Sequence, residues 1–422
     1  MLQAPARFEK VEAELAFVRG QVPSAGWGGG PIVVVLSRDA APGEAHAIDF
    51  QILYQPGSYW FYAEPGSYQL AAYEHLESHP KFNYAVGEPA VLHGDGRSIT
   101  LGPGARLEEQ DLGERFSKRV RLGPRFDVSA DNPGTRLDPA WQKLGEVIAL
   151  DDPRISLEAG HKGLVSADEF IEERATGLFF LEAYDPAKVP VLFVHGLGGA
   201  PIQFQAILEN LDRQRVQPWL LVYPSIVPVG IVSGILNDLM NVLQEIYRFP
   251  RAHVVGHSLG GLVARAYINE YGENSPRSYL ANFVSIDTPW GGHAGAGMFP
   301  GLPTAGETGS GDAPLRSDPT TDRRASGYVS LVDLAVGSGF LETLFDTPLP
   351  PGVAHHLVFG YGGSAAALAP GDGTVTLESQ LRMEAQREAS SQRGFAASHM
   401  GVLESPELIR YLGEVLAASP AR

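Results

Sequence analysis

Two kinds of hydrophobic pattern divide the chain. Between residues 31 and 75, short runs rich in β-branched and aromatic residues are separated by turn signals, a pattern typical of β-strands. The sequence Pro-Gly-Ser-Tyr occurs twice here, at 56–59 and 65–68, and each copy combines a turn with a strand start. The pattern predicts an all-β, sandwich-like accessory domain over residues 1–105. Its expected strands lie at 32–38, 47–54, 59–63 and 68–74.

From about residue 150 onward, continuous apolar runs alternate with segments of helical length. Such runs are typical of strands that are buried on both faces of a parallel sheet and joined by crossover helices. We therefore predict an α/β domain over residues 151–422, with a mostly parallel sheet flanked by helices. Its clearest elements are strands at 189–196, 219–225, 252–258, 281–289 and 355–363 and a helix at 234–249.

Two segments fit neither pattern. Residues 106–150 are charged and lack a regular period, which predicts a linker or an inter-domain wrap. Residues 291–327 are rich in Gly and Pro, and a loop of this length predicts a lid-like insertion at about 291–345. The apolar stretch at its end predicts a helix that either lines an acyl pocket or covers the core.

Composition narrows the classes of function. The net charge of −17 disfavours nucleic acids and anionic surfaces as partners. The absence of Cys excludes disulfides, thiolate metal sites and a cysteine nucleophile. No apolar run is long enough to cross a membrane, and the first twenty residues lack the pattern of a signal peptide. The expected location is extracytoplasmic, periplasmic or secreted, rather than cytoplasmic, with the export signal absent from this chain.

The sharpest motif is Gly256-His257-Ser258-Leu259-Gly260, which fits G-x-S-x-G. An apolar run precedes it and a predicted helix follows it, so Ser258 lies at a strand-to-helix turn, the arrangement of a nucleophile elbow. Gly256 and Gly260 let the neighbouring backbone approach closely, and the helix N-terminus favours developing negative charge. The plain alternative is an ordinary Gly-rich turn.

A second motif, His195-Gly196-Leu197-Gly198-Gly199, directly follows the predicted strand that starts at residue 189. Acyl transfer needs at least two N–H donors aimed at the oxyanion, and the backbone N–H groups of Leu197 and Leu259 are the candidates. His195 is expected to position this loop together with Gly196, as His257 supports the serine. As a lone metal ligand His195 lacks suitable neighbours, so neither a metal nor another cofactor is expected.

The acid and the base of such a site follow the serine in the chain, in the order Ser, Asp or Glu, His. His399 precedes the terminal helix and is the candidate base; His293, His355 and His356 are the other histidines beyond Ser258. Asp372 lies in a turn after the strand at 355–363, where it could accept the Nδ1–H of His399 and fix its tautomer. Asp287, at the end of the strand at 281–289, is the alternative acid.

The motifs HGLGG, GHSLGG, SIDTPWGG, GDGTV and SHMGVL, in this order, resemble the α/β-hydrolase superfamily. The resemblance covers about residues 185–415 and is greatest to bacterial lipases and esterases and to GPI inositol-deacylase-like lipases. It implies a triad of Ser258, Asp372 and His399 and an oxyanion hole from Leu197 and Leu259. It also implies an HG-x oxyanion loop, which in that superfamily accompanies esters of medium or long acyl chains. Many relatives carry an uncharged residue in place of Asp287.

The N-terminal region resembles transthyretin-like or carboxypeptidase-regulatory-like accessory domains. For the whole chain we expect a serine esterase or lipase that hydrolyses a small-molecule or lipid ester through an acyl-enzyme. The same residues would serve a thioesterase, an amidase or an acyltransferase, and a non-catalytic binding protein is a further alternative. Contact with a lipid surface is compatible with this function.

Overall fold

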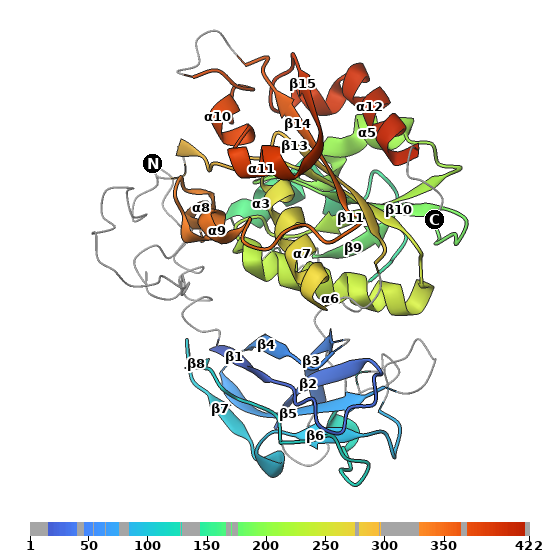
Figure 1. Cartoon of the computed structure of the whole chain (residues 1–422), viewed down its shortest axis with the longest axis vertical. Coiled ribbons are helices and arrows are strands. Elements are labelled where there is room, and N and C mark those ends of the chain that lie inside the picture. The colour runs from blue at the N-terminus through green and yellow to red at the C-terminus, as the bar shows by residue number, and fades with distance from the viewer. Residues whose placement is uncertain are drawn as a thin grey trace.

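The computed structural model describes most of the chain. The described residues are 16–39, 46–53, 55–63, 65–75, 84–126, 128, 144–165, 170, 176–274, 278–294, 296, 329–363 and 369–417. Within these ranges no helix is both long and apolar enough to cross a membrane. Figure 1 shows two parts, a β-rich N-terminal module and a larger α/β domain.

The strands of the N-terminal module are β1 (Ala16–Gln21), β2 (Ile32–Arg38), β3 (His46–Leu53), β4 (Ser58–Ala63), β5 (Gly66–Glu74), β6 (Ala90–Leu92), β7 (Ile99–Leu101) and β8 (Arg106–Leu107). Those of the α/β domain are β9 (Gly177–Phe180), β10 (Val189–Val194), β11 (Val216–Val222), β12 (Ala252–His257), β13 (Leu280–Ile286), β14 (Ala354–Gly360) and β15 (Ala389–Phe395). The α-helices are α3 (Leu157–Val165), α5 (Gln205–Asn210), α6 (Val229–Tyr247), α7 (Leu259–Asn274), α8 (Val329–Leu334), α9 (Gly339–Thr343), α10 (Leu377–Gln380), α11 (Met383–Glu388) and α12 (Pro406–Ala417). Short 3₁₀ helices are η1 (Gly94–Gly96), η2 (Pro124–Phe126), η3 (Pro153–Ile155), η4 (Pro201–Phe204) and η6 (Gly401–Glu404).

The N-terminal module consists of two sheets that face each other. One has the order β4-β1-β8, and the other has the order β3-β2-β5-β6, with β7 also paired to β5. Pairing is antiparallel except between β1 and β8. Alternate residues of each sheet point into a shared core, among them Val18, Val34, Phe61 and Leu70. The prediction of an N-terminal β-sandwich-like region is confirmed.

The segment predicted as a linker or wrap packs in part against this module. Strand β8 pairs with β1, and Leu112 and Phe116 are buried in the core between the sheets. Leu122 and Phe126 cover the outer face of the larger sheet. The buried apolar residues of this segment are irregularly spaced, because the segment crosses the sheets without forming a long strand. Its sequence therefore shows no regular hydrophobic period. Residues 106–126 therefore belong structurally with the N-terminal module.

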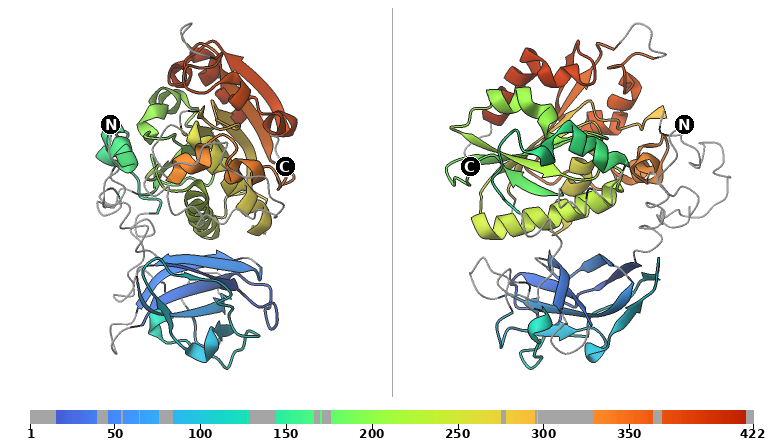
Figure 2. Two further views of the ribbon diagram at one scale, coloured as in Figure 1. Left: turned by 90° about the vertical axis from the view of Figure 1, so that its left-hand side faces the viewer. Right: turned by 180° about the vertical axis from the view of Figure 1, so that it is seen from behind.

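The α/β domain is built on a seven-stranded sheet with the order β15-β14-β13-β12-β10-β11-β9. All pairs are parallel except the edge strand β9, which is antiparallel to β11. Helices α6 and α7 pack on one face and helices α5 and α12 on the other, as the views in Figure 2 show. Buried apolar side chains fill both interfaces, which explains the continuous apolar runs of the central strands.

Two parts of this domain differ from expectation. Neither edge strand of the sheet was predicted, because β15 is mostly polar and β9 is only four residues long. The apolar stretch expected as one helix forms two short ones, α8 and α9, which cover the core with Leu331, Leu334, Leu341 and Leu344. Most of the expected lid-like insertion, residues 297–328, lies outside the described residues.

Helix α6 belongs to the α/β domain and also contacts the N-terminal module. The Trp60 ring of strand β4 packs so closely on Gly234 that a Cβ there would overlap it. Further along the helix, Gln51 Nε2 donates to Asp238 Oδ2 at 3.4 Å, and Val242 joins the apolar cluster on the outer face of the larger sheet. The N-terminal module thus docks on a helix that also packs against the sheet of the α/β domain.

Candidate active site

Ser258 joins strand β12 to helix α7. Its φ is +55°, in the left-handed region that residues other than glycine rarely adopt. The turn is anchored by Ser258 N–H, which donates to Ile286 O on the neighbouring strand at 2.8 Å. A Cβ on Gly256 would lie 2.6 Å from Gly260 O, and a Cβ on Gly260 would overlap the backbone of strand β10. Both glycines are therefore required for the close packing of this strand-to-helix turn.

The loop after strand β10 approaches this turn closely. A Cβ on Gly196 would lie 2.9 Å from Ser258 Cβ, so a larger residue would displace the serine or the loop. Leu197 follows in the same loop, and Leu259 is the first residue of helix α7, where the N–H has no acceptor within the helix. The two residues expected to supply the oxyanion donors thus lie on the two segments that flank Ser258.

His195 and the segment after strand β11 hold this loop in place. The buried ring of His195 stacks on Tyr223 with 4.3 Å between centroids, and the Tyr223 hydroxyl donates to His195 O at 2.7 Å. Gly198 N–H donates to Ser225 Oγ at 2.8 Å. Burial lowers the pKa of His195 to about 4, which leaves its ring neutral near pH 7. His195 therefore supports the loop rather than serving as a base.

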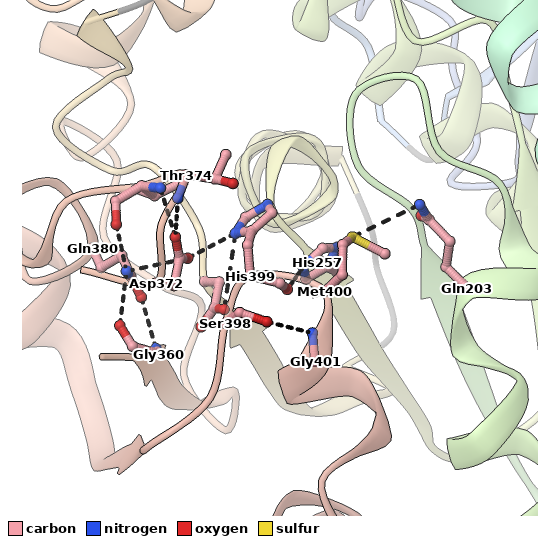
Figure 3. A network of polar contacts seen from close by, with 12 residues as sticks. Gln203, His257, Gly360, Asp372, Thr374, Gln380, Ser398, His399, Met400 and Gly401 are labelled. Carbon is pink, nitrogen blue, oxygen red and sulfur yellow. Dashed lines mark hydrogen bonds and ion pairs between the residues drawn. The ribbon is translucent and has the colours of Figure 1, made fainter. Parts of the chain in front are cut away.

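Asp372 and His399 form a hydrogen-bonded pair at the carboxyl ends of β14 and β15 (Figure 3). His399 Nδ1 lies 2.7 Å from Asp372 Oδ2. The other oxygen, Oδ1, accepts the N–H groups of Thr374 and Val375 at 2.7 Å each, and Gln380 Nε2 donates to Oδ2 at 3.3 Å. Burial raises the pKa of Asp372, but the bonds from His399 and the two amides outweigh it and bring the pKa below its usual value. The ionised carboxylate can orient His399 and stabilise its imidazolium form.

His257 connects the serine turn to the loop of His399. The centroids of the two imidazole rings lie 4.7 Å apart, and His257 Nε2 donates to His399 O at 3.0 Å. Burial, and then the neighbouring His399, lower the pKa of His257 to about 3, so it is neutral. Because Ser258 is the next residue in the chain, this contact brings the serine turn into the neighbourhood of the Asp372–His399 pair.

Asp287, the alternative acid, lies at the carboxyl end of strand β13 and is fully buried. Its Oδ2 is 3.9 Å from His399 Nδ1, which is too long for a hydrogen bond. Burial above all, and then the charge of Asp372, raise the pKa of Asp287 well above its usual value. In this structure Asp372, rather than Asp287, accepts the hydrogen bond from His399.

Three of these residues also have the spacing of metal ligands. His257, Asp287 and His399 offer ligand atoms that lie within 4.8 Å of one another. A metal ion bound through His399 Nδ1 would break the bond to Asp372, and one bound through Nε2 would occupy the other ring nitrogen. The hydrogen bonds of these residues therefore fit an acid–base pair better than a metal centre.

Sequence reasoning missed several supporting residues. Tyr223 and Ser225 follow the carboxyl end of strand β11, the edge at which open parallel sheets place their sites, and this position was the signal available for them. Gln380 is buried and bonds both the backbone of Gly360 and the carboxylate of Asp372. It had no sequence signal, because it lies in a four-residue helix outside any motif.

His293, one of the other histidines beyond Ser258, has a different environment from His399. Its Nε2 donates a hydrogen bond to the backbone carbonyl of Thr374 at 2.8 Å.

The strand order, the single antiparallel edge strand and the serine turn define an α/β-hydrolase fold. A family described as "Alpha/beta hydrolase of unknown function (DUF915)" matches residues 232–296, which run from helix α6 through the Ser258 turn to the loop after Asp287. No match was found among curated proteins.

Several solved structures are similar to part of the chain. The mature lipase BlEst2 of Bacillus licheniformis is 17% identical, with a TM-score of 0.41, and the match covers 56% of this chain and 94% of that one. A putative aryl esterase from Burkholderia cenocepacia is 17% identical, with a TM-score of 0.38 and coverage of 58% and 96%. The monoacylglycerol lipase of Paleococcus ferrophilus is 17% identical, with a TM-score of 0.37 and coverage of 55% and 95%.

Proposed function

We propose that the protein is a serine hydrolase that cleaves carboxylic esters, with Ser258, His399 and Asp372 as its triad. The observation that carries the proposal is the convergence of three loops at one edge of the sheet. Ser258 stands in a left-handed turn after strand β12, and the Asp372–His399 pair follows strands β14 and β15. The contact between His257 and His399 joins these loops. A nucleophile, a base and an orienting acid are the groups that acyl transfer requires.

In the proposed reaction, Ser258 Oγ attacks the ester carbonyl carbon, and His399 takes the proton of the Ser258 hydroxyl group. His399 then returns the proton to the leaving alcohol, and a water molecule releases the acid from the acyl-enzyme by the same route. Asp372, which already holds Nδ1 at 2.7 Å, keeps the other ring nitrogen free for these transfers and stabilises the imidazolium.

The negative charge that develops on the carbonyl oxygen would be stabilised by the N–H groups of Leu197 and Leu259. Leu259 begins helix α7, whose positive dipole end favours an anion. The loop of Leu197 is held in place before substrate binds, through Tyr223 and Ser225. Prearranged donors of this kind stabilise the transition state without reorganisation during the reaction.

An uncharged, apolar substrate is compatible with the residue next to the base. Met400 follows His399 directly and is 44% exposed, so an apolar side chain borders the base. The HG-x loop at His195 resembles the loops that accompany esters of medium or long acyl chains. With a net charge of −17, the chain would also repel polyanionic substrates. We therefore propose an acyl ester of medium or long chain, presented as a small molecule or at a lipid surface.

The experiment is hydrolysis of p-nitrophenyl esters from acetate to palmitate by the purified chain, with Ser258→Ala as control. We expect turnover that increases from acetate toward the medium chains and falls by at least about 10⁴-fold in the variant. Matched thioester, anilide and alcohol-acceptor assays separate the thioesterase, amidase and acyltransferase alternatives. Absence of turnover on all substrates would favour a non-catalytic binding protein, and an active Ser258→Ala variant would refute the proposed site.

A further inference from the structure

Asp287 has an unusual backbone and an unusual side chain. Its φ is +49°, and its N–H donates to Val358 O on the neighbouring strand at 3.0 Å, so the left-handed conformation is fixed by the sheet. Aspartate tolerates the left-handed conformation better than most residues. Asp287 is buried, however, so water does not solvate its carboxyl group. Strained residues of this kind cluster at functional sites, where the surrounding structure maintains them.

The carboxyl groups of Asp287 and Asp372 lie in opposite environments, although both are buried beside His399. Asp372 accepts hydrogen bonds from two backbone amides, from Gln380 and from the imidazole. The Asp372 carboxyl and the Gly360 amide lie close to Asp287, but within the described part of the chain neither oxygen of Asp287 accepts a hydrogen bond of ordinary geometry. The nearby Gly360 amide donates to Gln380 Oε1 at 2.9 Å instead. One negative charge is thus well supported at Asp372, and a second one at Asp287 is not.

We propose that Asp287 is a second acid for His399, a positioning residue that can take the place of Asp372 as the carboxylate partner of Nδ1. This inference rests on the proposed function. Asp287 Oδ2 needs to move by only about 1 Å, from 3.9 Å, to reach hydrogen-bond distance of Nδ1. Loss of the charge at Asp372 removes the second of the two causes that raise the pKa of Asp287, so that Asp287 gives its proton to solvent at a lower pH than in the wild type, although burial still holds its pKa above the usual value.

The other groups that face Asp287 do not supply a competing charge. His257, at the end of strand β12, is a neutral imidazole whose Nε2–H donates a hydrogen bond to the His399 carbonyl oxygen. Gln380, on helix α10, bonds Asp372 and the backbone and carries no charge. His399 and Asp372 are the ionisable neighbours already described. The charge balance of the site therefore depends on two carboxyl groups and one imidazole.

A double-mutant cycle on the full-length chain tests this role, with kcat/KM for p-nitrophenyl butyrate measured from pH 6 to pH 10. Asp287→Asn in the wild-type chain should lower kcat/KM about threefold, because the amide keeps the shape of the neutral acid. Asp372→Asn should lower it by about 10- to 100-fold, less than the roughly 10⁴-fold loss for a triad without a reserve acid. The double variant should lose about a further 100-fold.

The pH profile is a readout that a purely structural role would not change. Activity of Asp372→Asn should rise with pH beyond the range in which the wild type rises, because burial still raises the pKa of Asp287 after the Asp372 charge is gone. The double variant should lack this rise. Asp238→Asn, a buried carboxyl on helix α6 away from His399, is the matched control and should have the same effect in both backgrounds.

Thermal unfolding of each variant establishes that it is folded. If Asp287→Asn has the same effect in the wild-type and Asp372→Asn backgrounds, or if Asp372→Asn keeps the wild-type pH profile, Asp287 is not a second acid. Ser258→Ala separates this failure from failure of the proposed function. An inactive Ser258→Ala with an additive cycle overturns the role of Asp287 alone, whereas an active Ser258→Ala overturns the proposed triad itself.

Discussion

The N-terminal module and the seven-stranded sheet both bury apolar cores, but they place strained residues differently. In the described part of the module, the residues other than glycine with positive φ are Asp95 and Glu109, both exposed. In the described part of the α/β domain they are Arg248, exposed at the end of helix α6, and Ser258 and Asp287, at the carboxyl ends of neighbouring parallel strands and next to buried histidines. A left-handed residue at an exposed position needs no functional explanation, whereas one beside buried ionisable groups is a candidate for a functional role.

The largest effect expected from this comparison is at Ser258. Ser258→Ala removes the nucleophile while leaving the turn intact, and we expect kcat/KM for p-nitrophenyl esters to fall by at least about 10⁴-fold. Asp95→Gly removes a side chain from an equally left-handed but exposed position, and should change the rate less than about twofold. Equal kcat/KM values for Ser258→Ala and Asp95→Gly would contradict the role of Ser258 as the nucleophile.

A somewhat smaller loss is expected when the oxyanion loop is displaced. Gly196→Ala adds a Cβ 2.9 Å from Ser258 Cβ, which pushes the N–H of Leu197 away from the oxyanion. Removal of one such donor typically lowers kcat by about 10²- to 10³-fold. Gly413→Ala, on helix α12 with open space around the added Cβ, is the control and should keep full activity. The prediction fails if Gly196→Ala retains kcat within about tenfold of the wild type.

The contact between the two regions should affect stability rather than catalysis. Gly234→Val places a branched side chain where the Trp60 ring lies, and overpacking of this kind destabilises by about 1–3 kcal/mol. We expect a lower midpoint of thermal unfolding with kcat on a soluble ester unchanged. Gly230→Ala, on the same helix with nothing near its Cβ, should not lower the midpoint. A loss of kcat as large as that of Gly196→Ala would show that docking of the N-terminal module controls the site.

The smallest effect concerns the buried Asp238 at this contact. Burial above all, and then the charges of Asp49 and Glu270, raise the pKa of Asp238 well above its usual value. Such a group contributes stability below its unfolded pKa, and this contribution is lost as the pH rises through the folded pKa. Asp238→Asn should therefore raise the unfolding midpoint at pH 8 by about 2 °C or more, with little change near pH 4. An equal shift at both pH values would exclude ionisation of Asp238 as the cause.

The sequence predicted the interior of the sheet better than its edges. Strands β10, β12, β13 and β14 are continuous apolar runs because helices cover both of their faces. Strand β15 is an edge strand with a polar sequence, and its hydrogen bonds to β14 rather than its own side chains maintain it. The loop of Asp372 was placed correctly after strand β14, although strand β15 was absent from the prediction.

The sequence also predicted one part of the candidate site better than the rest. Chain order and turn position suffice to select Asp372 and His399, and the structure brings the two into hydrogen-bond contact. The second carboxyl at Asp287 and the support from Gln380 depend on distances between loops that are far apart in the sequence. No local pattern encodes those distances, so the sequence left Asp287 only as an alternative acid.

Covalent labelling with a fluorophosphonate, followed by peptide mass spectrometry, tests most directly whether Ser258 is a nucleophile activated by His399. We expect a single adduct on Ser258 in the wild-type chain, no adduct in Ser258→Ala, and labelling slowed by at least about 100-fold in folded His399→Ala. An unlabelled wild-type protein, or an adduct that persists in Ser258→Ala, would contradict this role of Ser258.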